Sequence, residues 1–123
     1  MKLKKLLIIF NLIFVTFFIS TVSYSYLIEP NSKMEPYQIV KTQLRSLKKN
    51  DKPTKDNGIE QTWILAHPNN QKNTGPLDRF KNMIKGKSYR MLLNHLDHKV
   101  IEVKSTDLTA LFEVTVLDKD KTY

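Results

Sequence analysis

The sequence predicts an α+β domain behind an apolar leader, and three observations lead to this fold class. Lysines and then an apolar run open the chain, apolar residues recur at helical spacing over residues 36–85, and strand patterns mark residues 89–117. Because helices come first and strands follow, without alternation between them, an antiparallel sheet is expected. We therefore expect an apolar signal helix and then about three short helices packed on a curved antiparallel sheet.

The leader is the stretch that says most about the compartment. Met1–Lys5 carries three lysines, and Leu6–Ile19 is apolar apart from Asn11 and Thr16. A basic region followed by an apolar region is the layout of an export signal. The lysines hold this end in the cytoplasm, so that the rest of the chain is carried across the membrane. Residues 1–25 are accordingly predicted to be a signal peptide or an uncleaved membrane anchor.

Two fates of the leader are consistent with the sequence. Ser23 and Ser25 supply the small residues that a cleavage site needs. A spanning helix needs about 20 predominantly apolar residues, and Leu6–Ile28 reaches that length only by including several serines. Either fate places the domain outside the cytoplasm: periplasmic or secreted if the leader is removed, and membrane-anchored if it is kept.

Composition limits both the chemistry and the partners. The chain has no cysteine, which excludes disulfides, thiolate chemistry and cysteine-ligated zinc. Three of the 20 Lys and Arg residues lie in the leader, which leaves 17 against 12 Asp and Glu. This dispersed excess suits a solvated surface with some affinity for anionic lipid or cell-wall polymer. No basic stripe is interleaved with aromatic residues, so nucleic acid is not an expected partner.

The first expected helix follows a polar linker over residues 26–35. Pro36 suits the first helical position, and apolar residues then recur at spacings of three and four, as Tyr37, Val40, Leu44 and Leu47. Such a stripe is typical of an amphipathic helix, which we place over residues 36–50. The domain itself is expected to extend over residues 36–123.

Two further short helices are predicted. One is expected to be capped by Asn57 and to end at Pro68, which cannot continue a helix. A polar loop is expected over residues 69–73. The other helix opens with Pro76 and ends at Gly86, for which we expect the left-handed conformation that often terminates helices.

Three segments in the last third of the chain show strand patterns: 89–93, 99–103 and 108–117. Residues 118–121 are typical of a hairpin turn, and Thr122–Tyr123 of the start of a returning strand. A sheet that ends on a turn leaves its last strand as an unpaired edge. We therefore expect the sheet to lack its last strand or strands and the chain to be a truncated copy of a longer domain.

The chain resembles an uncharacterised domain family that is catalogued by number only (4864) and is seen in exported bacterial and plant plastid proteins. The resemblance covers approximately residues 35–123. Its most specific parts are Asn50-Asp51 after the first helix and Thr74-Gly75-Pro76 with Arg79-Phe80 at the start of the third. It implies a fold similar to the nuclear-transport-factor-2-like cones, with no assigned activity. Members usually continue through one or two further strands.

A pocket between sheet and helices is the default binding site in such an architecture. We expect an apolar lining of Trp63, Phe80, Met83, Tyr89 and Phe112. We assign no catalytic residue, metal site or cofactor. The three histidines are His67, His95 and His98. The last two flank Asp97, but the surrounding pattern gives them no fixed geometry of the kind that a metal site requires.

Two functions of different classes fit this pattern. We favour a non-catalytic extracytoplasmic binding or interaction module for a small apolar ligand or a protein partner, with membrane contact through an uncleaved leader. The alternative is a small cone-fold enzyme, of isomerase or hydrolase type, that uses an inward-facing carboxylate or histidine. Arg79 is expected to pair with Asp51 or Asp56 and so to fasten the helices.

Overall fold

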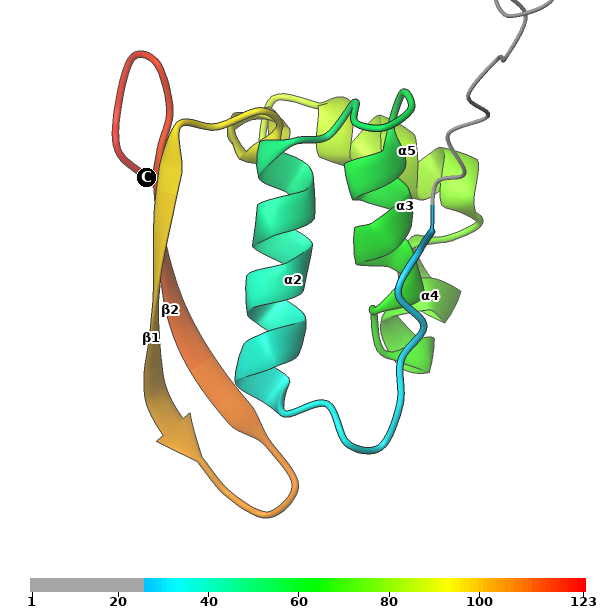
Figure 1. Cartoon of the computed structure of the whole chain (residues 1–123), viewed down its shortest axis with the longest axis vertical. Coiled ribbons are helices and arrows are strands. Elements are labelled where there is room, and N and C mark those ends of the chain that lie inside the picture. Colours follow the sequence, from blue (N-terminus) through cyan, green and yellow to red (C-terminus); the bar gives the residue numbers. More distant parts are fainter. Residues whose placement is uncertain (1–25) are drawn as a thin grey trace, which may run out of the picture.

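The computed structural model describes residues 26–123, and helices precede strands along them (Figure 1). The helices are α2 (Pro36–Lys48), α3 (Asn57–Ile64), α4 (Pro68–Thr74) and α5 (Leu77–Lys85), followed by the 3₁₀ turn η1 (Arg90–Leu92). The strands β1 (Asp97–Ser105) and β2 (Ala110–Leu117) pair in a two-stranded antiparallel sheet. The α+β class is thus confirmed, while the expected signal helix lies outside the described residues.

Helix α2 separates the sheet from the other helices. Figure 1 shows the β1–β2 hairpin on one side of α2 and the group α3, α4 and α5 on the other. Contacts agree with this view, because α2 packs on β1 and on α3, whereas α5 packs on α3 and α4. The described fold therefore has three layers, with a single helix as its middle layer.

The main apolar core lies among the helices. Four buried side chains form it: Leu47, Ile59, Phe80 and Ile84. Trp63 packs against them, with its ring centroid 5.1 Å from that of Phe80, so the aromatic pair joins α3 to α5 at a distance favourable for tilted rings. Gly75 lets the indole approach the chain, because a Cβ at Gly75 would overlap the Trp63 ring.

Asn50 connects the end of α2 to the start of α3. Its carbonyl oxygen accepts the Gly58 N–H at 2.8 Å, and its Oδ1 accepts the Ile59 N–H at 3.0 Å. The first amides of a helix have no partner within the helix, so Asn50 supplies from a distance what a side-chain cap would supply. Asn50 is 2 % exposed, which makes these bonds part of the interior.

The cap of α3 differs from the expected one. Asp56, and not Asn57, occupies the N-cap position, with φ 61° in the left-handed region and no side-chain cap bond. The Asn50 side chain instead donates from Nδ2 to Asp51 and Asp56 at 3.2 and 3.4 Å. Aspartate tolerates the left-handed conformation better than most residues, and here it turns the chain so that Gly58 reaches α2.

Three further segments depart from the sequence expectation. Residues 69–73 belong to α4, because Pro68 serves as its first residue and the His67 Nδ1 accepts the Asn69 N–H at 3.1 Å. Residues 89–93 form η1 and its flanks instead of a strand. Gly86 was expected to be left-handed but has φ −74°. Its carbonyl oxygen accepts hydrogen bonds from the Tyr89 and Arg90 amides, which begin the following 3₁₀ turn.

The hairpin follows the predicted alternation. Val100 on β1 and Val116 on β2 are buried, and the side chains next to each of them along its strand are more exposed. Strand β2 begins at Ala110 because Thr106 and Thr109 close the preceding turn, with an N–H···O bond of 2.7 Å. Beyond β2, Tyr123 exchanges two backbone hydrogen bonds with Val116, of 3.0 and 2.8 Å. The expected final turn is present, and Thr122 forms an isolated β-bridge with Leu117 in place of a strand.

We expect Gly58→Ala to destabilise the fold. The new Cβ would overlap the Ser46 carbonyl oxygen and lie 2.9 Å from the Asn50 Cα, and both are backbone atoms that cannot move aside alone. Overpacking of this kind costs about 1–3 kcal/mol, which exceeds the roughly 1 kcal/mol that alanine gains over glycine in a helix. Urea unfolding followed by circular dichroism measures the difference.

Gly86→Ala is the matched control for this substitution. Gly86 has an ordinary φ, and the nearest atom to its added Cβ is the Met83 carbonyl oxygen at 3.2 Å. We expect the control to lose clearly less stability. Equal losses in the two variants would show that the contact between α2 and Gly58 is not tight.

Candidate functional site

The five side chains expected to line one pocket lie in different layers of the structure. Trp63, Phe80 and Met83 belong to the helical core between α3 and α5. Phe112 lies on the sheet, with its ring centroid 6.1 Å from that of Tyr37 on α2. Tyr89 precedes η1 and is 43 % exposed. The structure therefore brings three of the five together, and α2 fills the space between these three and the sheet.

A different hollow offers the largest cavity described, and we call it the edge groove. Its volume is about 770 Å³, which falls within the roughly 300–1,000 Å³ of typical ligand pockets. It runs between α2, the junction of α3 with α4, and the first residues of β2. The residues that line it are Pro30, Pro36, Ile39, Val40, Gln43, Ile64, Leu65, Ala66, His67, Pro68, Asn70, Gln71, Ala110 and Phe112.

The edge groove exists because α2 turns different faces to its two neighbours. Leu44 and Leu47 are buried on the face of α2 that meets the core. Ile39 and Gln43 are about one helical turn apart on a neighbouring face, and both line the groove. Gln43 donates from Nε2 to the Thr62 carbonyl at 3.2 Å and so fixes α3 at this distance from α2. The side chains between the two helices then leave the groove open.

Three polar side chains of the edge groove, those of Gln43, His67 and Gln71, already have hydrogen-bond partners. Gln71 donates from Nε2 to the Trp63 carbonyl at 2.7 Å, and Gln43 is bound to Thr62. Asp, Glu, Lys and Arg are absent from the lining, and His67 is its one titratable residue. Because the His67 Nδ1 accepts the Asn69 N–H, this ring serves as the cap of α4. What the groove offers a ligand is chiefly apolar contact.

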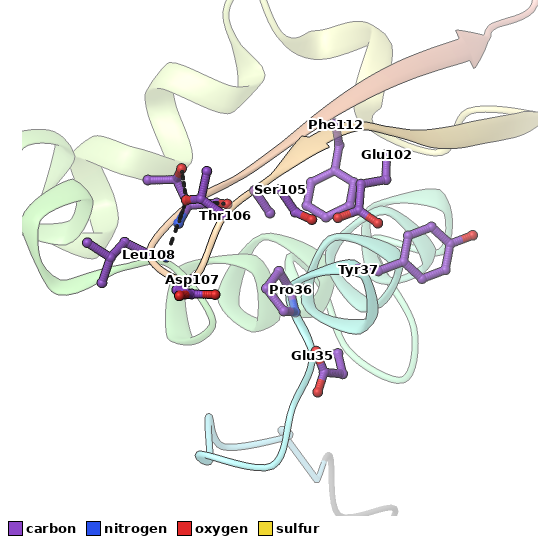
Figure 2. Close-up of a pocket in the computed structure, with 11 residues that line it drawn as sticks. Glu35, Pro36, Tyr37, Glu102, Ser105, Thr106, Asp107, Leu108 and Phe112 are labelled. Atoms are coloured by element: carbon purple, nitrogen blue, oxygen red, sulfur yellow. Dashed lines mark hydrogen bonds between the residues drawn. The ribbon is translucent and has the colours of Figure 1, made fainter.

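A second, smaller hollow lies where the start of α2 meets the tip of the hairpin (Figure 2). Its volume is about 290 Å³, and Glu35, Glu102 and Asp107 are among the residues that line it. In Figure 2 the Tyr37 hydroxyl points away from the Glu102 carboxylate, so the two do not form an acid–base pair. Within residues 26–123 no group of three or more His, Asp and Glu side chains is placed to hold a metal ion.

His95 and His98 form a hydrogen-bonded pair beneath the sheet. The His95 Nε2 and the His98 Nδ1 are 2.7 Å apart, and the His95 Nδ1 lies 2.6 Å from the Leu92 carbonyl oxygen. A carbonyl only accepts, so the His95 Nδ1 is the donor, and the Nε2 of a neutral His95 accepts from His98. His95 is 2 % exposed, and the pair ties η1 to β1.

Charges and burial around His98 disfavour its protonation. Burial is the main cause that lowers the pKa of His98, and His95, Lys41 and Lys48 act in the same direction. Asp97 opposes them, but it lies at the surface and forms a 3.5 Å ion pair with Lys48. The contact of His98 with its surroundings therefore stabilises the fold most when His98 is neutral.

Arg79 does not make the ion pair expected from the sequence. It is exposed and has no ion pair among residues 26–123, whereas Asp56 is held by Lys85 at 2.7 Å between Oδ2 and Nζ. This hydrogen bond lowers the pKa of the Asp56 carboxyl. Lys85, and not Arg79, pairs with Asp56 because Lys81 and Lys85 lie one turn apart on the side of α5 that meets α3.

A sequence signal for this arrangement does exist. Lys81 pairs with Glu60 at 2.8 Å, and Lys85 with Asp56. Glu60 and Asp56 are four residues apart in the chain, as are the two lysines, and this spacing repeats on one helix face. Because α3 and α5 run antiparallel, equal spacing on both allows two salt bridges to form side by side. Arg79 is two residues from Lys81 and therefore does not share this spacing.

Comparisons of the chain with protein-family models, with curated proteins and with solved structures found no match. Among the helices of residues 26–123, none has the length and apolar character needed to cross a membrane. The site is therefore interpreted from its own geometry.

We expect the free energy of unfolding to fall as the pH drops below about 6.5, the ordinary pKa of histidine. The pKa of His98 is lowered in the folded state, so the unfolded state binds more protons just below that pH. The stabilisation is present above pH 6.5 and is lost as the pH falls toward the lowered value. Urea unfolding at half-unit steps from pH 7.5 to 5 measures this slope.

His98→Gln is the matched variant for this pH series. Glutamine retains a donor for the His95 Nε2 but does not titrate, so the slope between pH 7 and 5.5 should be clearly smaller than that of the unmodified chain. An identical slope in both proteins would show that His98 does not carry the dependence.

Proposed function

We propose that the protein is an exported, non-catalytic interaction module that binds an apolar polypeptide segment in its edge groove. The observation that carries the proposal is the lining of this groove. A cavity of about 770 Å³ is bounded mostly by aliphatic, proline and aromatic side chains, with no acidic or basic residue other than His67. Apolar pockets with few polar groups are the usual form of binding sites.

Exposed apolar surface in this groove supports binding over a purely structural role. A groove that opens to water leaves its apolar lining hydrated, and covering that lining stabilises a complex by about 25 cal/mol for each Å² removed from water. Ile39, Val40 and Phe112 are only partly buried in the isolated chain. A partner that covers them gains this contribution without any rearrangement of the core.

The export part of the proposal rests on the leader. Lysines followed by the apolar run of Leu6–Ile19 are the layout of an export signal. The resemblance to the exported family numbered 4864 points the same way, and its cone fold is compatible with an α+β class. A leader that is kept would hold the groove close to the outer surface of a membrane.

The enzyme alternative has less support in this groove. It requires a carboxylate or an imidazole directed at a bound substrate. His67 is the one candidate in the lining, and its Nδ1 is engaged in the cap of α4. His95 is buried and bonded at both ring nitrogens, to Leu92 and His98. We therefore propose no catalytic residue.

The test uses a capped peptide of alternating valine and threonine with a lysine at each end. The full chain, held in a lipid nanodisc, carries a single cysteine in place of Asn70, an exposed residue of the groove lining, labelled with an environment-sensitive fluorophore; no other cysteine is present. We expect a saturable blue shift on addition of the peptide. The same label at Tyr89, outside the groove, should not respond.

Val40→Asp should weaken this binding at least about tenfold, because a carboxylate would lose its water when the peptide covers the groove. Tyr89→Ser, an exposed position outside the groove, should leave the affinity unchanged. Far-ultraviolet circular dichroism verifies that both variants fold. The absence of any response at millimolar peptide, or equal affinity in the Val40→Asp variant, would contradict the proposal.

A further inference from the structure

The β1–β2 hairpin is held on α2 mainly by apolar contact. Val100 and Val116 are buried on the face of the sheet that meets α2. The ion pair between Lys48 of α2 and Asp97 of β1 has a 3.5 Å separation, and both side chains are partly or largely exposed. Exposed ion pairs of this kind add little stability. A change at this small interface can therefore release the hairpin while the helical core stays folded.

The imidazole pair of His95 and His98 lies where the chain passes from η1 into the hairpin. The residue before it, Asn94, is fixed to the end of α2, because its N–H donates to the Leu47 carbonyl at 2.9 Å. His95 is 2 % exposed and donates from Nδ1 to the Leu92 carbonyl. Its Nε2 is therefore the acceptor for the His98 Nδ1, at 2.7 Å. One hydrogen bond between two rings thus joins η1 to β1.

This pair can hold one added proton without losing its hydrogen bond. A first proton binds to the Nε2 of His98, and the Nδ1 of His98 still donates to His95. A second proton has to bind to the Nε2 of His95, because the other three ring nitrogens then carry protons already. Two N–H groups would face each other at 2.7 Å, and neither can accept. Two added protons are therefore incompatible with the observed contact.

We infer that the imidazole pair is an acid-sensitive switch that releases the hairpin from α2 when the pair takes up two protons. His95 is anchored to η1, whereas His98 belongs to β1, so separating the rings moves β1 away from η1. Ala110 and Phe112 move with the hairpin, and both line the edge groove. Release therefore removes the sheet wall of the groove, whatever the groove binds.

The surroundings of the pair favour this response to acid. Burial is the main cause that lowers the pKa of His98, and the charged or titratable groups that act on it are His95, Lys41, Lys48 and Asp97. All but Asp97 act in the same direction as burial. From η1 and β2 the pair meets the Leu92 carbonyl and Val116, which do not titrate. Two added positive charges would thus lie beside two lysines and one carboxylate.

The pH range of the switch follows from the protons that each arrangement can hold. Free imidazoles take up protons below about pH 6.5. The closed pair holds at most one added proton, so release takes up at least one more. Each proton taken up on release raises the ratio of released to bound hairpin about tenfold per pH unit. We expect this ratio to rise about tenfold or more between pH 6 and pH 5.

Two spin labels on the full chain in a lipid nanodisc measure the release. They are attached to cysteines that replace Asn82 on α5 and Lys104 on β1, both exposed, and no other cysteine is present. Double electron–electron resonance should show a population with longer and broader distances that grows from pH 7.5 to pH 5. The pKa of the Asp97 carboxyl lies below its usual 3.8, through the His98 backbone N–H and Lys48, so Asp97 stays ionised over this range.

Trp63 provides the internal control for local release. It is the one tryptophan of the chain and packs in the helical core against Phe80. Because the hairpin leaves from the other side of α2, the emission of Trp63 should stay unchanged between pH 7.5 and pH 5. An emission change without acid would report unfolding of the core and not movement of the hairpin.

The double substitution of His95→Gln and His98→Gln removes both imidazoles, so its distance distribution should be the same at pH 7.5 and pH 5. His67→Asn is the matched control, because it removes the third histidine and asparagine can serve as the cap of α4. This control should keep the full response to acid. If the double variant does not fold, nitrogen magnetic resonance on the unmodified chain decides: the coupling through the hydrogen bond of the pair should be present at pH 7.5 and lost in the released population.

Three outcomes would overturn the inference. An unchanged distance distribution down to pH 5 would show that the pair does not release the hairpin. A change in Trp63 emission at the same pH as the change in distance would show that the whole domain unfolds together. Release that persists without the two imidazoles, or a coupling that survives in the released population, would assign the acid response to other groups.

Discussion

The close backbone contact between Asn50 and Gly58 is the constraint on which the described structure depends. A Cβ at Gly58 would overlap the end of α2, so the two helices meet at a distance that only glycine allows. The Asn50 side chain then bonds the Ile59 amide in the interior, where an unpaired group would cost about 1–3 kcal/mol. On its other side, the Asn50 N–H donates to the Asn94 Oδ1 at 3.1 Å. One residue thus fixes α3 and the entry to β1 relative to α2.

The edge groove and this constraint lie at opposite ends of α2. Asn50 follows the carboxyl end of the helix, whereas the edge groove uses Pro36, Ile39, Val40 and Gln43 from its amino-terminal half. Because α2 is one continuous helix, the position of its amino-terminal half follows from the contacts at its carboxyl end. No residue that lines the groove forms a hydrogen bond with Asn50, so we expect that binding and folding can be tested separately.

Periodicity predicted those elements whose apolar spacing reflects burial on one face. The stripe of α2 and the alternation of β2 were predictable in this way, and Leu44, Leu47 and Val116 are buried. The polar helix α4 has no buried residue and no such stripe, so its formation depends on the His67 cap and Pro68. Residues 89–93 carry apolar side chains for the helical core, and their alternation imitates a strand.

The expected pocket illustrates a limit of sequence patterns. Trp63, Phe80 and Met83 were identified as inward-facing, and they do pack together. Phe112 also faces inward, but toward the opposite side of α2. A pattern shows that a side chain is turned to the interior, but it does not show which layer it meets. Sequence patterns do not indicate the edge groove, because its lining comes from helix positions beside the main stripe, such as Ile39 and Gln43.

Native-state hydrogen exchange of the Ile59 amide tests the central claim most directly. If the Asn50 contact holds the structure together, this amide exchanges only when the whole domain unfolds. Its free energy of opening should then equal the value from urea unfolding and match those of core amides such as Ile84. An Ile59 amide that exchanges several kcal/mol more easily, while the Ile84 amide stays protected, would show that the junction opens by itself and would contradict the account.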